Sequence, residues 1–262
     1  MRTLVRVFDV LNEKGFRYVF KRVLSEVIRK RIHNFVYIKR LFANKSGLEV
    51  GGPSRIFRND GFVPLYKIIK ELDGCNFSNR TIWEGNIENG EKYNYYKNKE
   101  GTQYVSEATD LSLTPSSKYE FVISSNCLEH VANPLKAIEE WVRVVKKGGL
   151  LFLVLPNKDY CFDHNRPITE FFHLLEDYHN NITENDLTHL NEILELHDLK
   201  MDEPAGSLEQ FKARSLKNFE NRALHQHVFD ISLLKEIFSY FKLEVLLTHE
   251  GQEYMILGKK TA

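Results

Sequence analysis

The feature that most constrains this chain is an alternation of short apolar strands with helices, which begins at Gly47. Alternation of this kind is typical of an α/β domain with a mostly parallel sheet and helices on both faces. The predicted strands are residues 48–51, 73–77, 102–107, 119–125 and 150–155. The predicted helices are residues 64–72 and 134–145, the second with Pro134 in its first turn and Lys147-Gly-Gly at its end.

The stretch that follows the fifth predicted strand has a different pattern. Residues 157–227 predict helical segments rich in His, Asp, Asn and Arg, but no further strand. The alternation resumes with a helix at 231–241 and strands at 243–249 and 254–258. We therefore expect one domain over residues 46–262, with 157–227 inserted on the substrate side, because ligands bind at the carboxyl ends of strands in open α/β sheets.

Charge is unevenly distributed, although the whole chain has 36 basic and 36 acidic residues. Residues 1–45 carry twelve Lys and Arg against three acidic residues, and apolar residues recur among them at helical spacing. This predicts a basic helical extension that packs on the domain or on a second subunit, or that docks to an anionic membrane surface. No motif indicates binding to nucleic acid.

Three features favour a cytoplasmic location, or the inner membrane surface if the basic extension docks there. No segment approaches the length of apolar sequence that a membrane span needs. Charges interrupt the N-terminal residues, unlike the apolar middle of a signal peptide. The three cysteines, Cys75, Cys127 and Cys161, are scattered and lack metal-ligand spacing, which favours a reducing compartment.

Three motifs follow predicted strands at the edge where ligands are expected. The first, Glu49-Val-Gly-Gly-Pro-Ser54, ends a strand in glycines, which allow a sharp turn and the close approach of a ligand to the backbone. The second places Asp110 after the third strand, where a carboxylate accepts the exocyclic amine of an adenine or caps a turn. The third joins the buried strand at 119–125 to the polar turn Asn126-Cys-Leu-Glu-His130.

With Lys147-Gly-Gly and the apolar run that ends at Pro156, these motifs resemble the class I S-adenosylmethionine-dependent methyltransferases. The resemblance covers residues 47–157 and 228–258. It implies a Rossmann-like fold with a seven-stranded, mostly parallel sheet, S-adenosylmethionine as cofactor, and a small-molecule or glycan acceptor. Residues 162–169 and 173–178 are similar to methyltransferases of bacterial capsule and lipopolysaccharide clusters.

The resemblance also implies which residues surround the cofactor: Glu49, Gly51, Gly52, Pro53, Asp73, Asp110, Leu111 and Asn126. The glycine turn would lie against the methionine part of the cofactor, with the Glu49 carboxylate near its amino group. Asp110 and Leu111 would hold the adenine, and Asn126 would line the sulfonium pocket. The ribose would meet an acid at the end of the second strand, for which Asp73 is our prediction and Glu84 is the competitor.

Histidines dominate the candidates for acceptor chemistry. A hydroxyl acceptor benefits from a general base, and histidine suits this role near neutral pH. His164, directly after the fifth strand, is the first candidate and His130 the second. The predicted substrate-side residues are Arg166, His173, Arg222, His225 and His227. The two arginines would grip an acidic or phosphorylated acceptor, or else form structural ion pairs.

A metal site would form from Asp163, His164, His225 and His227 only if the two stretches meet in space, and we predict none. The favoured function is an O-methyltransferase that acts on a sugar or a sugar-linked, phosphate-type group in bacterial capsule or surface-polysaccharide synthesis. One alternative is a non-catalytic cofactor-binding scaffold. Another is a nicotinamide-dependent sugar oxidoreductase, which the missing third glycine and the missing Tyr-x-x-x-Lys pair disfavour.

Overall fold

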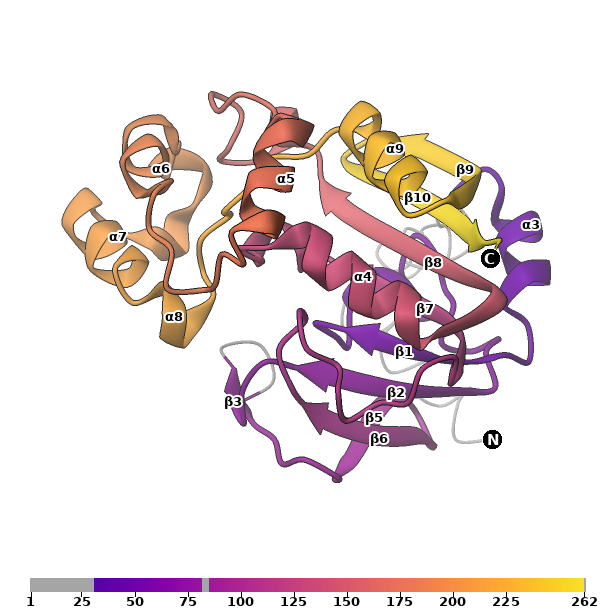
Figure 1. The fold of residues 1–262 in the computed structure, drawn as a ribbon. Helices are drawn as coiled ribbons and strands as arrows, with labels where there is room; N and C mark the ends of the chain where they lie inside the picture. Colours follow the sequence, from indigo (N-terminus) through magenta and orange to yellow (C-terminus); the bar gives the residue numbers. More distant parts are fainter. Residues whose placement is uncertain (1–30, 82–84, 262) are drawn as a thin grey trace, which may run out of the picture. The chain divides into compact units, whose positions relative to one another are not determined.

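The computed structural model describes residues 31–81 and 85–261, which divide into two compact units (Figure 1). The described part of the smaller unit comprises residues 31–43 and 55–68. It contains helix α3 (Phe35–Phe42), whose residues Phe35, Ile38 and Phe42 are buried at helical spacing. Residues 1–30 of the predicted basic extension lie outside the described part of the chain.

The larger unit, residues 44–54 and 69–261 where described, is built on an eight-stranded sheet in the order β5-β6-β2-β1-β7-β8-β10-β9. The strands are β1 (Ser46–Val50), β2 (Glu71–Asn76), β5 (Lys92–Tyr96), β6 (Lys99–Val105), β7 (Tyr119–Ser125), β8 (Val145–Pro156), β9 (Leu243–Glu250) and β10 (Glu253–Lys260). The five strands from β6 to β8 are parallel, whereas β5 and β10 each run antiparallel to their neighbours. A separate two-stranded sheet pairs β3 (Arg80–Thr81) with β4 (Gly85–Asn86).

The order of the strands reverses at β1, which has β2 on one side and β7 on the other. The carboxyl ends of β1 and β7 therefore form a topological switch point, the place where open α/β sheets bind ligands. Gly51 follows β1 and Asn126 follows β7, so both turns stand at this point.

One face of the sheet carries helices α4 (Pro134–Val144), α5 (Phe171–His179) and α9 (Ile231–Tyr240) (Figure 1). Alternate residues of the strands, such as Leu151, Leu153 and Leu155, join one core cluster with the apolar sides of these helices. Trp141 of α4 is fully buried in this cluster, and its indole N–H donates to the carbonyl of Ala108 at 2.9 Å. The core therefore also fixes the loop that follows β6.

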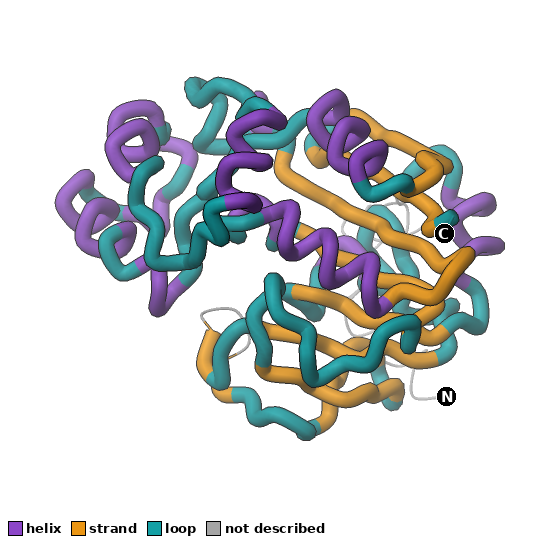
Figure 2. Tube along the Cα trace, viewed as in Figure 1, coloured by secondary structure: helices purple, strands orange, loops and turns teal. Residues whose placement is uncertain are grey.

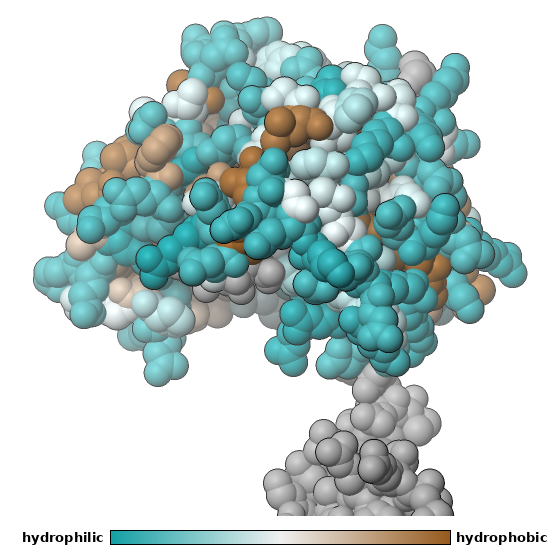
Figure 3. Space-filling view, turned by 90° about the horizontal axis from the view of Figure 1, so that it is seen from below, coloured by the Kyte–Doolittle hydropathy of each residue, from teal (hydrophilic) through white to brown (hydrophobic). Residues whose placement is uncertain are grey.

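The insertion after β8 contains the short helices α6 (Leu190–Leu196), α7 (Leu208–Ser215) and α8 (Asn218–Asn221) in addition to α5, and no strand among residues 157–227 (Figure 2). Helices α6 and α7 share a small core with Leu190, Ile193, Ala205, Phe211 and Leu224. Apolar residues also gather at the surface on the side of these helices (Figure 3), and Met201, Leu208, Leu216 and Phe219 are exposed there. No helix among the described residues is both long enough and apolar enough to cross a membrane.

Several sequence predictions need correction. The sheet has eight strands rather than seven, because the tract before β6 adds the antiparallel strand β5. Residues 64–72 form turns and the start of β2 instead of a helix. Lys147-Gly-Gly does not close α4, which ends at Val144. It lies within β8, where Gly148 has a φ of +76° and the register with β7 shifts.

Candidate active site

The glycine turn after β1 is tightly enclosed by neighbouring groups. Gly51 has a φ of +83°, a left-handed conformation that favours glycine. A Cβ at Gly51 would lie 2.8 Å from the Cβ of Cys127, and one at Gly52 would lie 2.2 Å from the Cδ of Glu49. The Asn76 side-chain amide, at the end of β2, donates to the Gly52 carbonyl at 3.0 Å. The missing side chains thus let three strand ends meet at the switch point.

Glu49 is fully buried beneath this turn. Its carboxylate accepts hydrogen bonds from the Tyr93 hydroxyl at 2.7 Å and from the Ser54 backbone N–H at 3.0 Å. Tyr93 comes from β5, and its ring lies against Gly74 of β2, where a Cβ would be 2.3 Å from the ring. The Glu49 carboxylate, which we predicted to lie near the cofactor, therefore holds the turn in place. The peptide bond between Gly52 and Pro53 is cis.

The turn after β7 brings polar groups to the same edge. Asn126 has a φ of +49°, which asparagine tolerates better than most residues, and its N–H donates to the Val154 carbonyl at 3.0 Å. Glu129 follows and is only 1% exposed, yet neither of its carboxylate oxygens has a hydrogen-bond partner among the described residues. Burial raises the pKa of Glu129 to about 7.

Glu253, at the start of β10, is a second partly buried carboxyl at this edge. Burial raises the pKa of Glu253 to about 7, although a hydrogen bond with the Asn126 side chain acts to lower it. The Oε2 of Glu253 has no hydrogen-bond partner in the described part of the chain. The charge of Glu253 also acts on Glu129 and helps to raise the pKa of that group. Uncompensated buried carboxylates are costly, so this edge of the sheet is suited to a positively charged ligand.

His225 and Asp163 form a buried pair beside Glu129. The Nδ1 of His225 donates a hydrogen bond to Asp163. Burial alone would lower the pKa of His225, but the hydrogen bond and the charge of Asp163 outweigh it, so the pKa is raised. The hydrogen bond at Nδ1 leaves Nε2 of His225 able to accept a proton.

His130 packs against this pair, with its ring centroid 4.6 Å from that of His225. Its Nδ1 donates to the Leu224 carbonyl at 3.0 Å. Burial, followed by the charge of His225, lowers the pKa of His130 to about 3. His130 is therefore neutral and a weak base.

A small pocket opens where these groups meet. Its lining residues are Glu129, Pro156, Lys158, Cys161, Asp163, His225, His227, Val228 and Phe229. It lies between the carboxyl ends of the central strands and the insertion. Of the residues predicted for the substrate side, His225 and His227 line this pocket, whereas Arg166 and Arg222 do not.

The two arginines predicted for the substrate side, Arg166 and Arg222, form ion pairs within the protein. Arg166 is 2% exposed and donates to Asp163 at 3.1 Å and to the carbonyls of His225 and Gln226 at 2.7 and 3.1 Å. Arg222 pairs with Glu107 and stacks on neighbouring aromatic rings. The alternative that we left open for both arginines, a structural role, is the one that their contacts support.

His164 lies away from the pocket lining. Its Nε2 is 3.0 Å from the Oδ2 of Asp198, and 34% of its side chain is exposed. Because both partners belong to the insertion, this pair links the segment after β8 to the segment after α6. Of His130, His164 and His225, only His225 lines the pocket.

Asp73 is placed differently from the ribose acid that we expected. It lies in the middle of β2, level with Leu48, whereas the strand ends at Asn76. Its carboxylate is held by the Lys118 ammonium at 2.9 Å, the Tyr119 hydroxyl at 2.6 Å and the Thr102 N–H at 2.8 Å. These contacts do not support a ribose contact, and the competitor, Glu84, lies outside the described residues.

Asp110 and Leu111 follow β6 as predicted. The Asp110 carboxylate is exposed and accepts a hydrogen bond from the Ser112 N–H at 3.0 Å. Hydrogen bonds from the Ser112 side chain and then from its backbone lower the pKa of Asp110. Leu111 is buried, and its N–H and carbonyl are bound by Glu140 and Arg143 of α4, both at 2.8 Å. The loop is thus held in a fixed position, and Asp110 caps a turn.

Sequence reasoning did not join His173 with His227. The two side chains, with Asp177 and His189, form one group whose candidate donor atoms all lie within 4.8 Å of one another. The four residues that we considered for a metal, Asp163, His164, His225 and His227, do not form one group. His225 contacts Asp163, whereas His227 contacts Asp177. His164 contacts Asp198.

Three carboxyl residues of the site, Glu129, Asp163 and Glu253, were not among the predicted catalytic or cofactor-binding residues. Glu129 directly precedes His130 in the polar turn that we singled out, so a signal for it existed. Asp163 was considered only as a metal ligand. It lies 62 residues from His225 in the sequence, so no local pattern indicated that the two side chains form a hydrogen bond.

The chain matches the sequence model of the family described as "Methyltransferase domain" over residues 19–204. No curated protein matches the chain. Similar solved structures include methyltransferases that depend on S-adenosylmethionine from Methanosarcina mazei (15% identity, 88% of this chain and 98% of that chain, TM-score 0.49) and Aquifex aeolicus (13%, 86% and 87%, 0.44). Another is from Mesorhizobium loti (10%, 86% and 95%, 0.47).

The family match covers more than half of the chain and includes β1, β2, β7 and β8 with both turns of the switch point. The eight-stranded sheet places these elements in a Rossmann-like arrangement. The chain therefore belongs to the methyltransferase-domain family and is an S-adenosylmethionine-dependent methyltransferase.

Proposed function

We propose that this enzyme methylates a hydroxyl group of a sugar or sugar-linked acceptor, and that His225 and Asp163 supply the general base. The observation that carries the proposal is the buried His225–Asp163 hydrogen bond at a pocket beside the switch point. A hydroxyl acceptor must lose a proton during methyl transfer, so a base within reach of the acceptor favours oxygen as the nucleophile.

The residues at the switch point fit the cofactor. S-adenosylmethionine carries a sulfonium and an ammonium group, and the uncompensated carboxyls of Glu129 and Glu253 would stabilise positive charge there. The glycine turn at Gly51 and Gly52 brings backbone rather than side chains to the edge of the sheet. We place the methionine part of the cofactor at this turn, Asn126 near the sulfonium, and the adenine towards Asp110 and Leu111.

The cofactor supplies an activated methyl group, so the protein has to align the acceptor, exclude water and remove one proton. Asp163 accepts from Nδ1 of His225, which fixes the tautomer and leaves Nε2 to take the proton from the acceptor hydroxyl. Asp163 is itself held by Arg166 at 3.1 Å. The base is thus oriented before an acceptor binds.

The acceptor class rests on the insertion. Asp163, which lines the pocket, belongs to residues 162–169, one of the two segments whose sequence resembles methyltransferases of capsule and lipopolysaccharide clusters. We therefore propose an acceptor from bacterial surface-polysaccharide synthesis, either a nucleotide-activated sugar or a saccharide with a phosphate-type substituent.

The test measures methyl transfer from labelled S-adenosylmethionine to a panel of nucleotide sugars, saccharides and amines. His225→Gln and Asp163→Asn should lower kcat by about 10²–10⁴-fold, because each removes or misorients the base. Their affinity for S-adenosylhomocysteine should stay near that of the wild type. His164→Gln is the matched control and should keep its kcat.

Three results would contradict the proposal. Wild-type kcat in His225→Gln, together with a loss of kcat in His164→Gln, would move the base to His164. Transfer to amines but to none of the hydroxyl acceptors would exclude the O-methyltransferase assignment. Binding of the cofactor without transfer to any acceptor would favour the scaffold alternative.

A further inference from the structure

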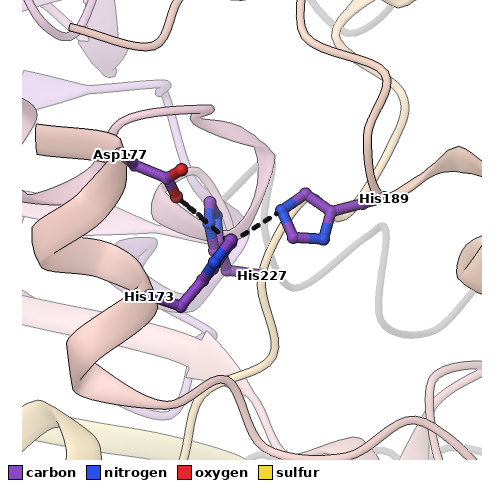
Figure 4. A group of neighbouring side chains, drawn as sticks. All are labelled: His173, Asp177, His189 and His227. Atoms are coloured by element: carbon purple, nitrogen blue, oxygen red, sulfur yellow. Dashed lines mark hydrogen bonds and ion pairs between the residues drawn. The ribbon is translucent and has the colours of Figure 1, made fainter. Parts of the chain in front are cut away.

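A second cluster of ionisable side chains adjoins the proposed acceptor pocket through His227 and takes no part in the mechanism above. It comprises His173, Asp177, His189 and His227 (Figure 4). Figure 4 shows the four side chains pointing toward a common centre from α5, from the loop before α6 and from the segment before α9. His227 is 1% exposed and the Asp177 side chain 9%, whereas 36% of the His173 side chain is exposed.

Sequence spacing explains only half of this convergence. His173 and Asp177 are four residues apart on α5 and therefore share one face of the helix. His189 and His227 come from distant parts of the insertion, and the fold brings them to the same face. Asp177 is fixed further because its backbone carbonyl accepts from the Asn133 side-chain amide at 2.9 Å, at the start of α4.

Three of the six distances between donor atoms are close to those of a tetrahedral metal site, and all six are within 4.8 Å. Nε2 of His173 is 3.0 Å from Nε2 of His189 and 3.4 Å from Oδ2 of Asp177, which is 3.0 Å from Nε2 of His227. A tetrahedral zinc ion with ligands at about 2.0–2.2 Å has its donor atoms about 3.3–3.5 Å apart. Small side-chain rotations would therefore complete the site.

The protonation state of the imidazoles also suits a cation. A metal binds the neutral imidazole, so ligand histidines must be deprotonated at one nitrogen. Burial, followed by the charges of His227 and His173, lowers the pKa of His189 to about 4. Burial likewise lowers the pKa of His227 despite its contact with Asp177. In their metal-binding, neutral form, three imidazoles beside one carboxylate would leave a net negative site.

We propose that His173, Asp177, His189 and His227 bind one Zn²⁺ ion. Imidazole nitrogens and one carboxylate oxygen are ligands that zinc accepts. Four protein ligands complete a tetrahedral coordination sphere, which is the pattern of a structural rather than a catalytic zinc site. The ion joins α5, the segment before α6 and the segment before α9, and thereby holds the insertion together. This inference does not depend on the identity of the methyl acceptor.

The experiment uses the full chain after removal of metal with a chelator. Zn²⁺ is titrated by calorimetry in competition with a weaker chelator, and Co²⁺ is added separately, since its visible absorption distinguishes four-coordinate from six-coordinate sites. We expect one Zn²⁺ per chain, a four-coordinate Co²⁺ spectrum, and a rise in Tm on addition of Zn²⁺.

His173→Ala and His189→Ala are the test variants, and circular dichroism checks their folding. Each should weaken Zn²⁺ binding by at least about 10–100-fold and abolish the rise in Tm. His179→Ala, an exposed histidine on the same helix, is the matched control and should bind like the wild type. His189 lies in a loop, so this variant stays informative if a substitution on α5 disturbs the helix.

Either of two outcomes overturns the proposal: a wild-type chain that takes up no Zn²⁺ or gives a six-coordinate Co²⁺ spectrum, or folded variants that bind Zn²⁺ as tightly as His179→Ala. Failure of this test leaves the His225–Asp163 proposal untouched, because that proposal is measured by kcat in variants outside the cluster.

Discussion

Substitution of Gly52 by alanine tests whether the turn at the switch point needs bare backbone. An alanine Cβ at this position would lie 2.2 Å from the Cδ of Glu49 and 2.3 Å from the hydroxyl of Tyr93. Both neighbours are buried, at 0% and 2% exposure, so neither can swing into solvent. Gly52, unlike Gly51, is not left-handed, so the cost of the new methyl group is steric rather than conformational.

The magnitude follows from these contacts. Forcing a methyl group into a packed interior costs about 1–3 kcal/mol. If Glu49 moves to make room, the buried hydrogen bond from Tyr93 at 2.7 Å is lost, and a hydrogen bond to a charged group contributes about 1.5–3 kcal/mol. Because relaxation shares these costs, we expect Gly52→Ala to lose about 2–4 kcal/mol of unfolding free energy. We also expect at least about tenfold weaker binding of the cofactor, equivalent to about 1.4 kcal/mol.

The assay combines urea unfolding with calorimetric titration of S-adenosylhomocysteine. Gly148→Ala is the control, because Gly148 has a φ of +76° in β8 and no atom within 4 Å of its would-be Cβ. It should lose about 1 kcal/mol of stability through backbone strain and keep its affinity for the cofactor product. Unchanged affinity and stability in Gly52→Ala would refute the close approach that we infer from the turn.

Three further substitutions test other parts of the site. Asp73→Asn should lose about 1–3 kcal/mol of unfolding free energy in urea because it weakens a buried network. Asp73→Asn should leave cofactor affinity unchanged. Weaker cofactor binding with unchanged stability would instead indicate that Asp73 contacts the ribose. Glu129→Gln should weaken binding of S-adenosylmethionine about tenfold more than binding of S-adenosylhomocysteine, because only the former carries the sulfonium charge; equal losses in titration calorimetry would argue against a nearby carboxylate. Hydrogen bonding to Arg143 lowers the pKa of Glu140 below its usual 4.5, so this contact stabilises the fold above that pH and is lost as the pH falls through the lowered value. Glu140→Gln should therefore be less stable than the wild type at pH 7, and Tm measurements should show the difference shrinking in acid rather than persisting.

The strands of the parallel sheet were the most predictable elements. Residues 150–155 lie within β8 as predicted, because a continuous apolar run bounded by polar turns has few alternatives to a buried strand. Strand β5 was missed although its signal was present: Tyr93 and Tyr95 are buried and alternate with exposed Lys92 and Asn94. That period of two was obscured by the polar composition of the tract.

Residues 64–72 were predicted to form a helix, whereas the structure has turns, bends and the start of β2 there. Leu65, Tyr66 and Ile69 are buried in this segment without a helical backbone. The backbone conformation depends on contacts outside the segment, which a local pattern does not encode.

The chemistry of the site was less predictable than the fold for the same reason. The motifs located both turns of the switch point, since each follows its own strand directly. The partners of the histidines lie 62 residues from His225, in Asp163, and 50 residues from His227, in Asp177. No local spacing encodes such pairs, so the choice of base among several histidines could not be made from sequence.

The short segment from His225 to His227 connects the two proposed sites of the insertion. Buried Arg166 donates to the backbone carbonyls of His225 and Gln226, while the backbone carbonyl of Glu129 accepts from the N–H groups of Gln226 and His227 at 2.7 and 3.3 Å. Held from both sides, the segment directs His225 toward Asp163 and His227 toward Asp177. An ion bound at His227 would therefore restrain the backbone that carries His225. The proposed metal site would in this way help to keep the proposed base in position.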